Sequence, residues 1–303
     1  MSELVLAVDI GGTKILVGLV AADGSIAAEL QAPTPAQEGA EAIIATIAGL
    51  ARRLLDDSSS PVRRCGVGTA GVVGEDGEIT SATDHIRGWA GTPLRQRLAE
   101  VLGLPTVVLN DVQAAALAES VLGAARGKRS ALVVALGTGI GGAIVRNGAV
   151  ERGAAGIAGS IGHHLSPLRQ GRPCPCGSTD HLEAYASGTA MQLEYQRRTG
   201  ETLLLRDIAA RAAAGETEAA AVLAEAAEVL GTVIGSANNL VDADIIVVGG
   251  GVAELGEVLF GPARIAAARE ALGASRHAPI VAAALGPRAC LTGAALAALA
   301  PDR

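Results

Sequence analysis

The sequence predicts an α/β protein of two domains, and two observations support that expectation. Strand-like and helix-like segments alternate after the N-terminal region, with a helix expected over 37–55, a strand over 64–73 and a helix over 93–102. An apolar strand, a Gly/Thr-rich turn and a second apolar strand occur twice, at 3–30 and at 131–153. Because one supersecondary unit is used twice, we expect one copy in each domain.

The remaining elements continue the same alternation. A strand over 105–111 leads into a helix that begins near Val112, and a Gly/Pro/Cys/His-rich loop follows the second repeat from about 153 to 180. The rest of the chain is expected to form Ala-rich helices over 188–239, a buried strand over 244–251, a further helix, a strand over 279–285 and a last apolar helix.

Composition points to a protein of the cytoplasm that acts on a small molecule. Half of the 303 residues are hydrophobic, yet no stretch reaches the roughly 18 uninterrupted apolar residues of a membrane span, and the start lacks a signal-peptide pattern. A net charge of −7 and an aromatic content of 1% disfavour a nucleic-acid surface. Four scattered cysteines do not suggest a disulfide framework. We therefore expect neither a membrane nor a nucleic-acid partner.

The stretch GTGIGG, with Gly137, Gly139 and Gly142, has the glycine spacing of a dinucleotide-binding fingerprint. That fingerprint requires a helix after the glycines, because the helix N-terminus holds the pyrophosphate. Here β-branched residues surround Asn147-Gly148, a pair that favours a type I′ hairpin turn. A second strand is expected instead, which disfavours a nicotinamide-dependent dehydrogenase.

The first glycine turn is formed by Asp9, Gly11, Gly12, Thr13 and Lys14, at the end of the first strand. Glycines allow close backbone approach to a ligand, exposed backbone N–H groups bind anions, and Asp9 can hold a metal ion through water. It is not a Walker A loop, because the spacing differs and a strand follows. An ordinary hairpin turn is the structural alternative.

Asn110-Asp111 ends a strand just before a helix. A carboxylate there is placed to act as a general base on a hydroxyl group. Either residue can equally serve as a helix N-cap.

Gly249, Gly250 and Gly251 lie between a buried strand and a helix. Such glycines allow a flat ligand to lie against the backbone. Tight packing of the helix on the strand explains them equally well.

His163, Cys174, Cys176 and His181 form a candidate zinc site, with His164 as a possible substitute for His163. Two imidazoles and two thiolates are a ligand set that Zn²⁺ accepts in tetrahedral structural sites. The surrounding loop has few apolar residues, so a metal would supply its organisation. Two buried free thiols with surface histidines are the alternative.

Taken in order, DIGGTK, GVGTAGVV, RGW, LND, LGTGIGG, IGHH with CPCGSTDHLE, and VVGGG resemble the ROK family of sugar kinases and repressors. The resemblance covers nearly the whole chain and implies a two-domain sugar kinase/actin-like (ribonuclease H-like) fold with a central cleft. The expected domains are 1–120, with the last helix at about 290–303 packing back on it, and 121–289. Because no DNA-binding extension precedes the first strand, the chain resembles the kinase branch.

The resemblance also implies roles for single residues. Asp111 corresponds to the catalytic base, Asn110 to its sugar-binding neighbour, His163 to a residue that ligates zinc beside the sugar, and Glu183 to a glutamate that binds sugar hydroxyls. The implied ATP-binding residues are Asp9, Gly11, Gly12, Thr13, Lys14, Gly137, Thr138, Gly139, Gly249, Gly250 and Gly251; the implied sugar-binding residues are Gly71, Asn110, Asp111, Ser160, His163 and Glu183.

The sequence departs from the family pattern mainly where the family holds its sugar. Ser160 stands where a glutamate is usual, Ala70-Gly71 where Pro-Gly is usual, and His85 begins a segment that usually reads Asn-Leu-Pro-Gly-Trp. His181 replaces a third zinc cysteine. Losing a charged hydrogen-bond acceptor costs roughly 2 to 3 kcal/mol for a ligand that needs it.

These features predict a kinase that uses ATP and Mg²⁺, carries structural Zn²⁺, forms a homodimer, and phosphorylates a primary (6-)hydroxyl of a hexose-like sugar. An amino sugar such as kanosamine or glucosamine, from secondary metabolism or antibiotic biosynthesis, is the favoured substrate. Glucose and a C7 cyclitol are alternatives, as is a non-catalytic sugar-binding sensor.

Overall fold

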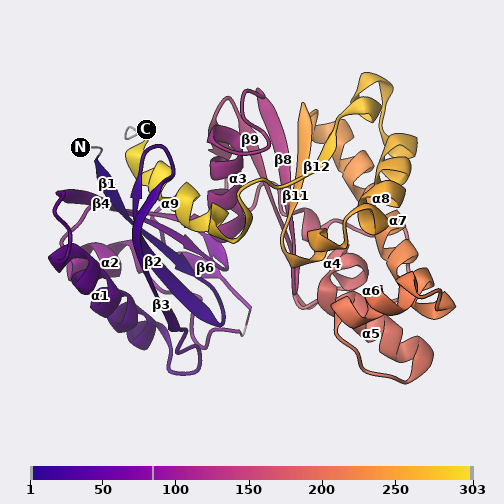
Figure 1. Ribbon diagram of the computed structural model, residues 1–303, viewed down its shortest axis with the longest axis horizontal. Helices are drawn as coiled ribbons and strands as arrows, with labels where there is room; N and C mark the ends of the chain where they lie inside the picture. The colour runs from indigo at the N-terminus through magenta and orange to yellow at the C-terminus, as the bar shows by residue number, and fades with distance from the viewer. Residues whose placement is uncertain (1–2, 84, 301–303) are drawn as a thin grey trace. The chain divides into compact units, whose positions relative to one another are not determined.

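The computed structural model describes residues 3–83 and 85–300, so the end of the expected helix at 301–303 lies outside the described part. The chain divides into two compact units (Figure 1). Unit 1 comprises Met1–Arg126, Ala149–Ala158 and Pro287–Arg303, and unit 2 comprises Gly127–Gly148 and Gly159–Gly286. These units are defined by contacts within the chain. The domain boundaries expected from the sequence remain a prediction.

Unit 1 is built on a five-stranded sheet in the order β3-β2-β1-β4-β7. Three strands are parallel, namely β1 (Leu4–Ile10), β4 (Val62–Thr69) and β7 (Thr106–Asn110). The antiparallel part is β2 (Lys14–Ala21) and β3 (Ile26–Pro33). The other elements are α1 (Ala40–Asp56), β5 (Val72–Val73), β6 (Ile79–Ser81), α2 (Leu94–Leu102), α3 (Asp111–Val121), β10 (Ala149–Glu151) and α9 (Ala289–Leu299).

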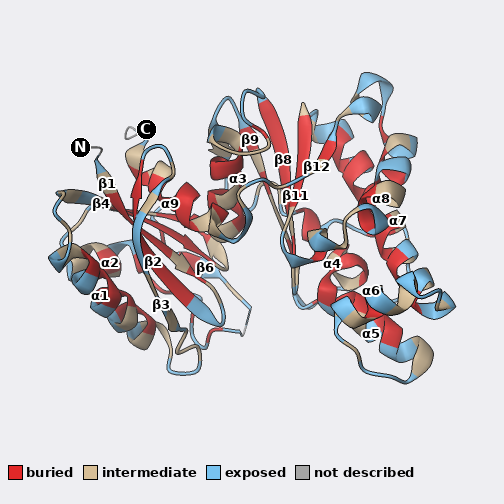
Figure 2. Ribbon diagram, viewed as in Figure 1, coloured by how far each residue is buried: buried red, intermediate tan, exposed pale blue. Residues whose placement is uncertain are grey.

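Alternation along β1 decides which face of the sheet each of its side chains meets. Leu6 and Val8 belong to the core formed with α1 and α2, whereas Val5 and Ala7 pack with α9 on the opposite face. Figure 2 shows these strands as largely buried. Asp9, two residues after Ala7, therefore lies on the α9 face.

Glycines allow α9 to lie unusually close to its neighbours. A Cβ added to Gly66 of β4 would lie 1.8 Å from the Ala294 carbonyl oxygen, and one added to Gly293 would lie 1.7 Å from the Ala114 carbonyl oxygen. Real Cβ atoms do not approach backbone this closely. The N-terminal end of α9 is thereby held against the sheet beside the ends of β1 and β4.

Four strands of the second five-stranded sheet belong to unit 2, in the order β9-β8-β11-β12. Its strands are β8 (Ser130–Leu136), β9 (Ile140–Arg146), β11 (Ile245–Gly249) and β12 (Ile280–Ala282), with only β9 antiparallel among them. Its helices are η1 (Ile161–His163), α4 (Glu183–Ala186), α5 (Gly188–Thr199), α6 (Leu205–Ala213), α7 (Thr217–Val241), η2 (Gly251–Leu255), α8 (Glu257–Glu270), η3 (Gly273–His277) and, at its boundary with unit 1, η4 (Gly286–Arg288).

The glycines of GTGIGG lead into a strand, as the sequence predicts. β9 pairs antiparallel with β8, and Asn147 and Gly148 after it have φ values of 52° and 74°. Positive φ at both central positions is the requirement of a type I′ turn. The nicotinamide alternative is therefore excluded, because the helix it needs is absent after these glycines.

One helix, α7, is long and apolar enough by composition to cross a membrane, but 61% of its most apolar window is buried within the protein. It is a central member of the unit 2 core, where it packs against α8 and the sheet. The same apolar composition is expected of a core helix.

Candidate active site

Two carboxylates and one thiol gather at the strand ends of unit 1. Asp9 on β1 pairs in register with Gly68 on β4, and Gly68 pairs with Leu109 on β7, two residues before Asp111. A Cβ on Gly68 would lie 2.3 Å from the Cys290 Sγ and 3.8 Å from the Asp111 Cα. The missing side chain at Gly68 thus makes room for the thiol. Sequence reasoning missed Cys290, which only the path of α9 brings here.

Burial makes both carboxylates hard to ionise. Burial is the main reason that the pKa of Asp111 is raised to about 6, and the nearby Asp9 charge adds to the rise. Burial also raises the pKa of Asp9, although a hydrogen bond with the Cys290 thiol and the positive charge of Lys14 oppose the rise. A pair of acids that repel each other in a partly buried site favours a cation between or beside them.

Asn110 is a helix cap, which was one of its two sequence interpretations. Its Oδ1 accepts hydrogen bonds from the backbone N–H groups of Val112 at 2.9 Å and Gln113 at 3.3 Å. Its Nδ2 donates to the carbonyl oxygen of Gly71 at 3.0 Å. Asn110 therefore fixes the start of α3, where Asp111 lies, and ties the Gly71 loop to it.

The Gly71 loop is held from a second direction. Trp89, buried in the unit 1 core, donates its ring N–H to the Ala70 carbonyl oxygen at 3.2 Å. Gly71 itself has a φ of +97°, and a Cβ there would lie 2.8 Å from the Ser81 carbonyl oxygen. The loop is rigid because its backbone groups are bonded on both sides. Contact between this loop and a sugar remains a prediction from the sequence.

The DIGGTK turn closes a tight hairpin between β1 and β2. The backbone N–H of Gly11 donates to the Lys14 carbonyl oxygen at 3.0 Å, and the Thr34 hydroxyl donates to the Gly11 carbonyl oxygen at 2.7 Å. Gly12, Thr13 and Lys14 are exposed. The turn therefore presents solvent-facing backbone at the same strand end as Asp9, which suits an anion.

In unit 2, the turn between β8 and β9 is held by the segment that begins α4 and α5. The Gly188 N–H donates to the Gly137 carbonyl oxygen at 2.8 Å. The Ile140 N–H donates to Oε2 of Glu183 at 2.6 Å. A Cβ on Gly139 would lie 2.4 Å from that same oxygen. Glu183 thus supports the glycine turn directly, a contact that no sequence spacing indicated.

The glycines at 249–251 have different surroundings: tight packing requires a glycine at 250, whereas the position at 251 is open. Gly250 has a φ of +88°, and a Cβ there would lie 2.2 Å from the Leu136 carbonyl oxygen, so tight packing explains it. A Cβ on Gly251 would meet nothing within 4 Å. Gly250 brings this loop directly against the end of β8, next to the turn that begins at Gly137.

The four predicted metal ligands come together in the loop after η1. Their ligand atoms all lie within 4.8 Å of one another, and His164 is outside the group. The Cys176 Sγ lies 3.2 Å from the Nδ1 of His181, and the Cys174 Sγ lies 3.7 Å from the Nδ1 of His163. Ligands around a tetrahedral Zn²⁺ are about 3.3–3.8 Å apart. The donor set fits such an ion, and the two Cys–His pairs are close to this spacing.

Asp180 also organises this loop, and sequence reasoning missed it. Its carboxylate accepts hydrogen bonds from the backbone N–H groups of residues 170, 171 and 172 at 3.0–3.2 Å, and from the Tyr185 hydroxyl at 2.5 Å. These bonds hold the pKa of Asp180 below its usual value. Part of the organisation of this loop therefore comes from hydrogen bonds to one carboxylate.

Ser160 immediately precedes η1 and His163 is the last residue of η1, which packs closely against β9. A Cβ on Gly162 would lie 1.9 Å from the Ile140 carbonyl oxygen. Ser160 is exposed at the start of η1 and His163 is exposed at its end. Both predicted sugar-binding residues therefore lie on one short turn. This turn packs against Ile140, whose backbone N–H donates to Glu183.

Comparisons with known proteins show which family the chain belongs to. The family description "ROK family" matches residues 5–302. The glucokinase of Streptomyces coelicolor is 33% identical, covering 99% of this chain and 98% of its own; the N-acetylmannosamine kinase of Shigella boydii is 34% identical, covering 97% of each. A ROK family glucokinase from Streptomyces griseus, solved with glucose and AMPPNP, has a TM-score of 0.83 and 32% identity, with 98% and 99% of the chains covered.

The fold is the actin-like two-domain fold of sugar kinases. The chain belongs to the ROK family, so the resemblance inferred from its motifs is confirmed.

Gly139→Ala should destabilise the protein, because its Cβ would displace the Glu183 carboxylate from the Ile140 N–H. We expect a loss of about 1–3 kcal/mol in the free energy of unfolding, measured by urea denaturation. Gly137→Ala is the matched control, since a Cβ there meets nothing within 4 Å.

In the double variant Gly139→Ala/Glu183→Ala, the two effects should be clearly less than additive, because the clash disappears with the carboxylate. Strictly additive effects would show that the Glu183 contact does not constrain the turn.

Proposed function

We propose that this chain, an ATP-dependent sugar kinase, transfers the γ-phosphoryl group of ATP to a primary (6-)hydroxyl of a hexose-like sugar. The observation that carries the assignment is Asp111, a carboxylate at a strand end whose pKa of about 6 suits proton transfer near neutral pH. Membership of the ROK family and the named activities of its relatives support the same reaction.

In this mechanism Asp111 accepts the proton of the attacking hydroxyl. Asn110 fixes the helix start from which Asp111 projects, so the carboxylate is held ready for the substrate. The turns at 11–14 and 137–139 offer backbone N–H groups to the phosphates of ATP, and Gly249, Gly250 and Gly251 line the adenosine side. Phosphoryl transfer depends mainly on such positioning and charge neutralisation.

The acidic pair at the strand ends fits Mg²⁺, which prefers oxygen ligands. Asp9 would hold the ion, directly or through water, and the Cys290 thiol that hydrogen-bonds to Asp9 would orient its carboxylate. When bound, Mg²⁺ supplies positive charge that offsets the charge developing on the phosphates.

The cluster of His163, Cys174, Cys176 and His181 fits structural Zn²⁺, and we propose that it holds one. Burial raises the pKa of the Cys174 thiol to about 11, so an ion would bind with release of that proton. Holding His163 in this way would fix the turn that also carries Ser160.

For the acceptor we propose an amino sugar such as kanosamine, of the kind made in secondary metabolism or antibiotic biosynthesis. The support is the set of changes at Ala70, His85 and Ser160, where the family pattern places sugar-binding groups. Glucose is the second candidate, because relatives are named glucokinase and one was solved with glucose.

We also propose that the protein works in the cytoplasm as a homodimer. The four cysteines are all free, and two of them belong to the metal cluster, which suits a reducing compartment. The homodimer follows from the family resemblance, and light scattering of the purified protein measures it directly.

Asp111→Asn should lower kcat at least about 100-fold, because the amide cannot accept the proton. For the unsubstituted enzyme, kcat/KM for the sugar should fall as the pH drops through about 6, where Asp111 becomes protonated. The measurement is the pH profile of ADP release under sugar-limited conditions. Near-normal turnover by Asp111→Asn would exclude this base.

Thermal unfolding provides the folding control for that variant. The pKa of Asp111 is higher in the folded state than its ordinary value of 3.8, so its protonated form favours folding, and this stabilisation is lost as the pH rises through about 6. Asp111→Asn cannot ionise. It should therefore unfold at the same or a higher temperature than the parent protein at pH 8.

Ser160→Glu should raise kcat/KM for glucose by about 10- to 100-fold, since it restores a charged hydrogen-bond acceptor. The same change should lower or leave unchanged the value for the preferred amino sugar. Steady-state kinetics with both sugars measure the ratio. A parent enzyme that already favours glucose, and that loses glucose activity in Ser160→Glu, would contradict the proposed specificity.

The purified protein should contain about one zinc ion per chain, and Cys176→Ser should lose most of it. His164→Ala is the matched control, because His164 is adjacent to His163 but outside the cluster. Zinc is quantified by plasma mass spectrometry. Equal zinc contents in the two variants would show that this cluster is not a zinc site.

A further inference from the structure

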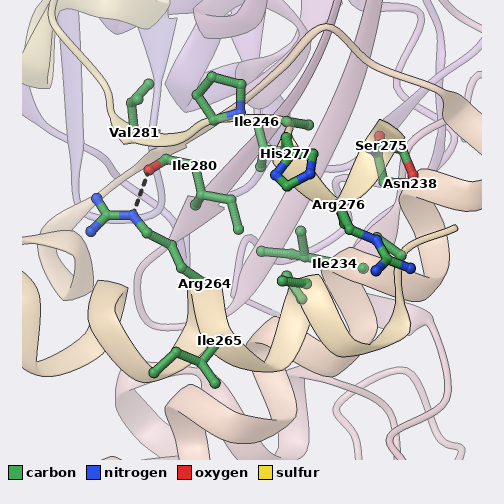
Figure 3. A pocket seen from close by; sticks show the side chains of 16 residues that line it. Ile234, Asn238, Ile246, Arg264, Ile265, Ser275, Arg276, His277, Ile280 and Val281 are labelled. Carbon is green, nitrogen blue, oxygen red and sulfur yellow. Dashed lines mark hydrogen bonds between the residues drawn. The ribbon is translucent and has the colours of Figure 1, made fainter. Parts of the chain in front are cut away.

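A pocket of about 550 Å³ lies in unit 2, between α7, α8 and the segment that leads through η3 into β12 (Figure 3). Its volume is in the range of sites for small molecules, roughly 300–1,000 Å³. None of the residues predicted to bind ATP, sugar or metal lines it.

The pocket is at the opposite end of the unit 2 sheet from the glycine turns. Ile246 and Ile280, which line it, are near the first residues of the parallel strands β11 and β12. Gly250 follows the last residue of β11, four residues beyond Ile246. At about 3.3 Å per residue, the two ends of this strand are roughly 13 Å apart. The pocket is therefore separate from the proposed ATP site.

Its wall contains a buried amide with an unused hydrogen-bond donor. Asn238 is 1% exposed, and its Oδ1 accepts a hydrogen bond from the backbone N–H of Ala243 at 2.9 Å. This bond determines the orientation of the side-chain amide. Among the described residues, its Nδ2 is the one buried side-chain N or O atom without a hydrogen-bond partner. An unpaired buried donor costs about 1–3 kcal/mol, which an acceptor brought by a ligand would offset.

The rim of the pocket carries one positively charged side chain, Arg276, beside the imidazole of His277. Both residues are exposed, and neither forms an ion pair with another residue in the described part of the chain. Arg264 is already occupied, since it donates to the Ile280 carbonyl oxygen at 3.0 Å and pairs with Glu257. No acidic residue appears among the described residues that line the pocket.

The remaining lining is mostly apolar. Figure 3 shows Ile234, Ile246 and Ile280 around the same space as His277 and Arg276. Small side chains, Ala267 and Ala268 of α8 and Ala271 just after it, leave room along the helix. The pocket thus joins an apolar surface to a cationic rim in a chain whose net charge is −7.

We infer that this pocket binds a small organic anion, with an apolar body against the isoleucines and alanines and a carboxylate, sulfonate or phosphate group toward Arg276 and His277. The inference does not depend on the proposed kinase activity. It assigns unit 2 a second ligand site, at the far end of its sheet from the glycine turns.

The probe for this site is 8-anilinonaphthalene-1-sulfonate, an anion with an apolar aromatic body, titrated into the folded protein and followed by fluorescence. We expect saturable binding of about one probe per chain that saturating Mg²⁺-AMPPNP does not displace. Absence of saturable binding, or displacement by the nucleotide, would overturn the inference.

Two variants test the location of the bound probe. Arg276→Glu should weaken binding about tenfold or more by reversing a rim charge, and Ala268→Phe should weaken it by filling the pocket. Arg206→Glu, on the exposed surface of α6 with 80% of its side chain accessible, is the matched control and should change the affinity less than about twofold. Circular dichroism confirms folding of each variant.

If Arg276→Glu and Ala268→Phe, both folded, bind the probe as the parent protein does, the pocket is not its site. If Arg276→Glu instead changes the mass of the particle in light scattering while the parent binds no probe, the pocket is covered by another copy of the chain. Either result contradicts the inference.

Discussion

The proposed chemistry depends on the close approach of α9 to the sheet of unit 1. Gly66 and Gly293 remove the Cβ atoms that would block it, and Gly68 leaves space for Cys290 between the two carboxylates. Asp9 and Asp111 are consequently held, partly buried, at the ends of strands separated by one neighbour. Their raised pKa values reflect mainly the cost of burying their charges. A site built in this way is suited to a metal-nucleotide substrate.

In unit 2, hydrogen bonds rather than close helix packing hold the glycine turn in place. Its glycine turn is supported from below by Glu183, which binds the Ile140 N–H, and by Gly188, which binds the Gly137 carbonyl oxygen. Glu183, two residues after the last predicted metal ligand His181, thus fixes the turn that is proposed to hold phosphates. A carboxylate already engaged with the backbone has one oxygen left for a sugar hydroxyl. Sugar binding and phosphate binding would then share one side chain.

Local patterns were enough to predict much of this structure. The hairpin at Asn147-Gly148 and the metal cluster follow from residue types at short spacing, and alternating strands and helices gave the fold class. Cys290 and Asp180 could not be found in that way. Cys290 reaches Asp9 from the far end of the chain, and Asp180 acts through backbone N–H groups that leave no mark on the sequence. Such contacts depend on tertiary packing.

The most direct test of the central claim is a substrate panel with Mg²⁺-ATP. Glucose, mannose, N-acetylmannosamine, glucosamine, kanosamine and a valiolone-type cyclitol would be compared by ADP release, with the phosphate located on each product by NMR. The account predicts sugar-dependent ADP release and phosphate on the primary hydroxyl, with an amino sugar preferred. The account would be contradicted if none of these sugars stimulated ADP release, or if the phosphate were found at another position.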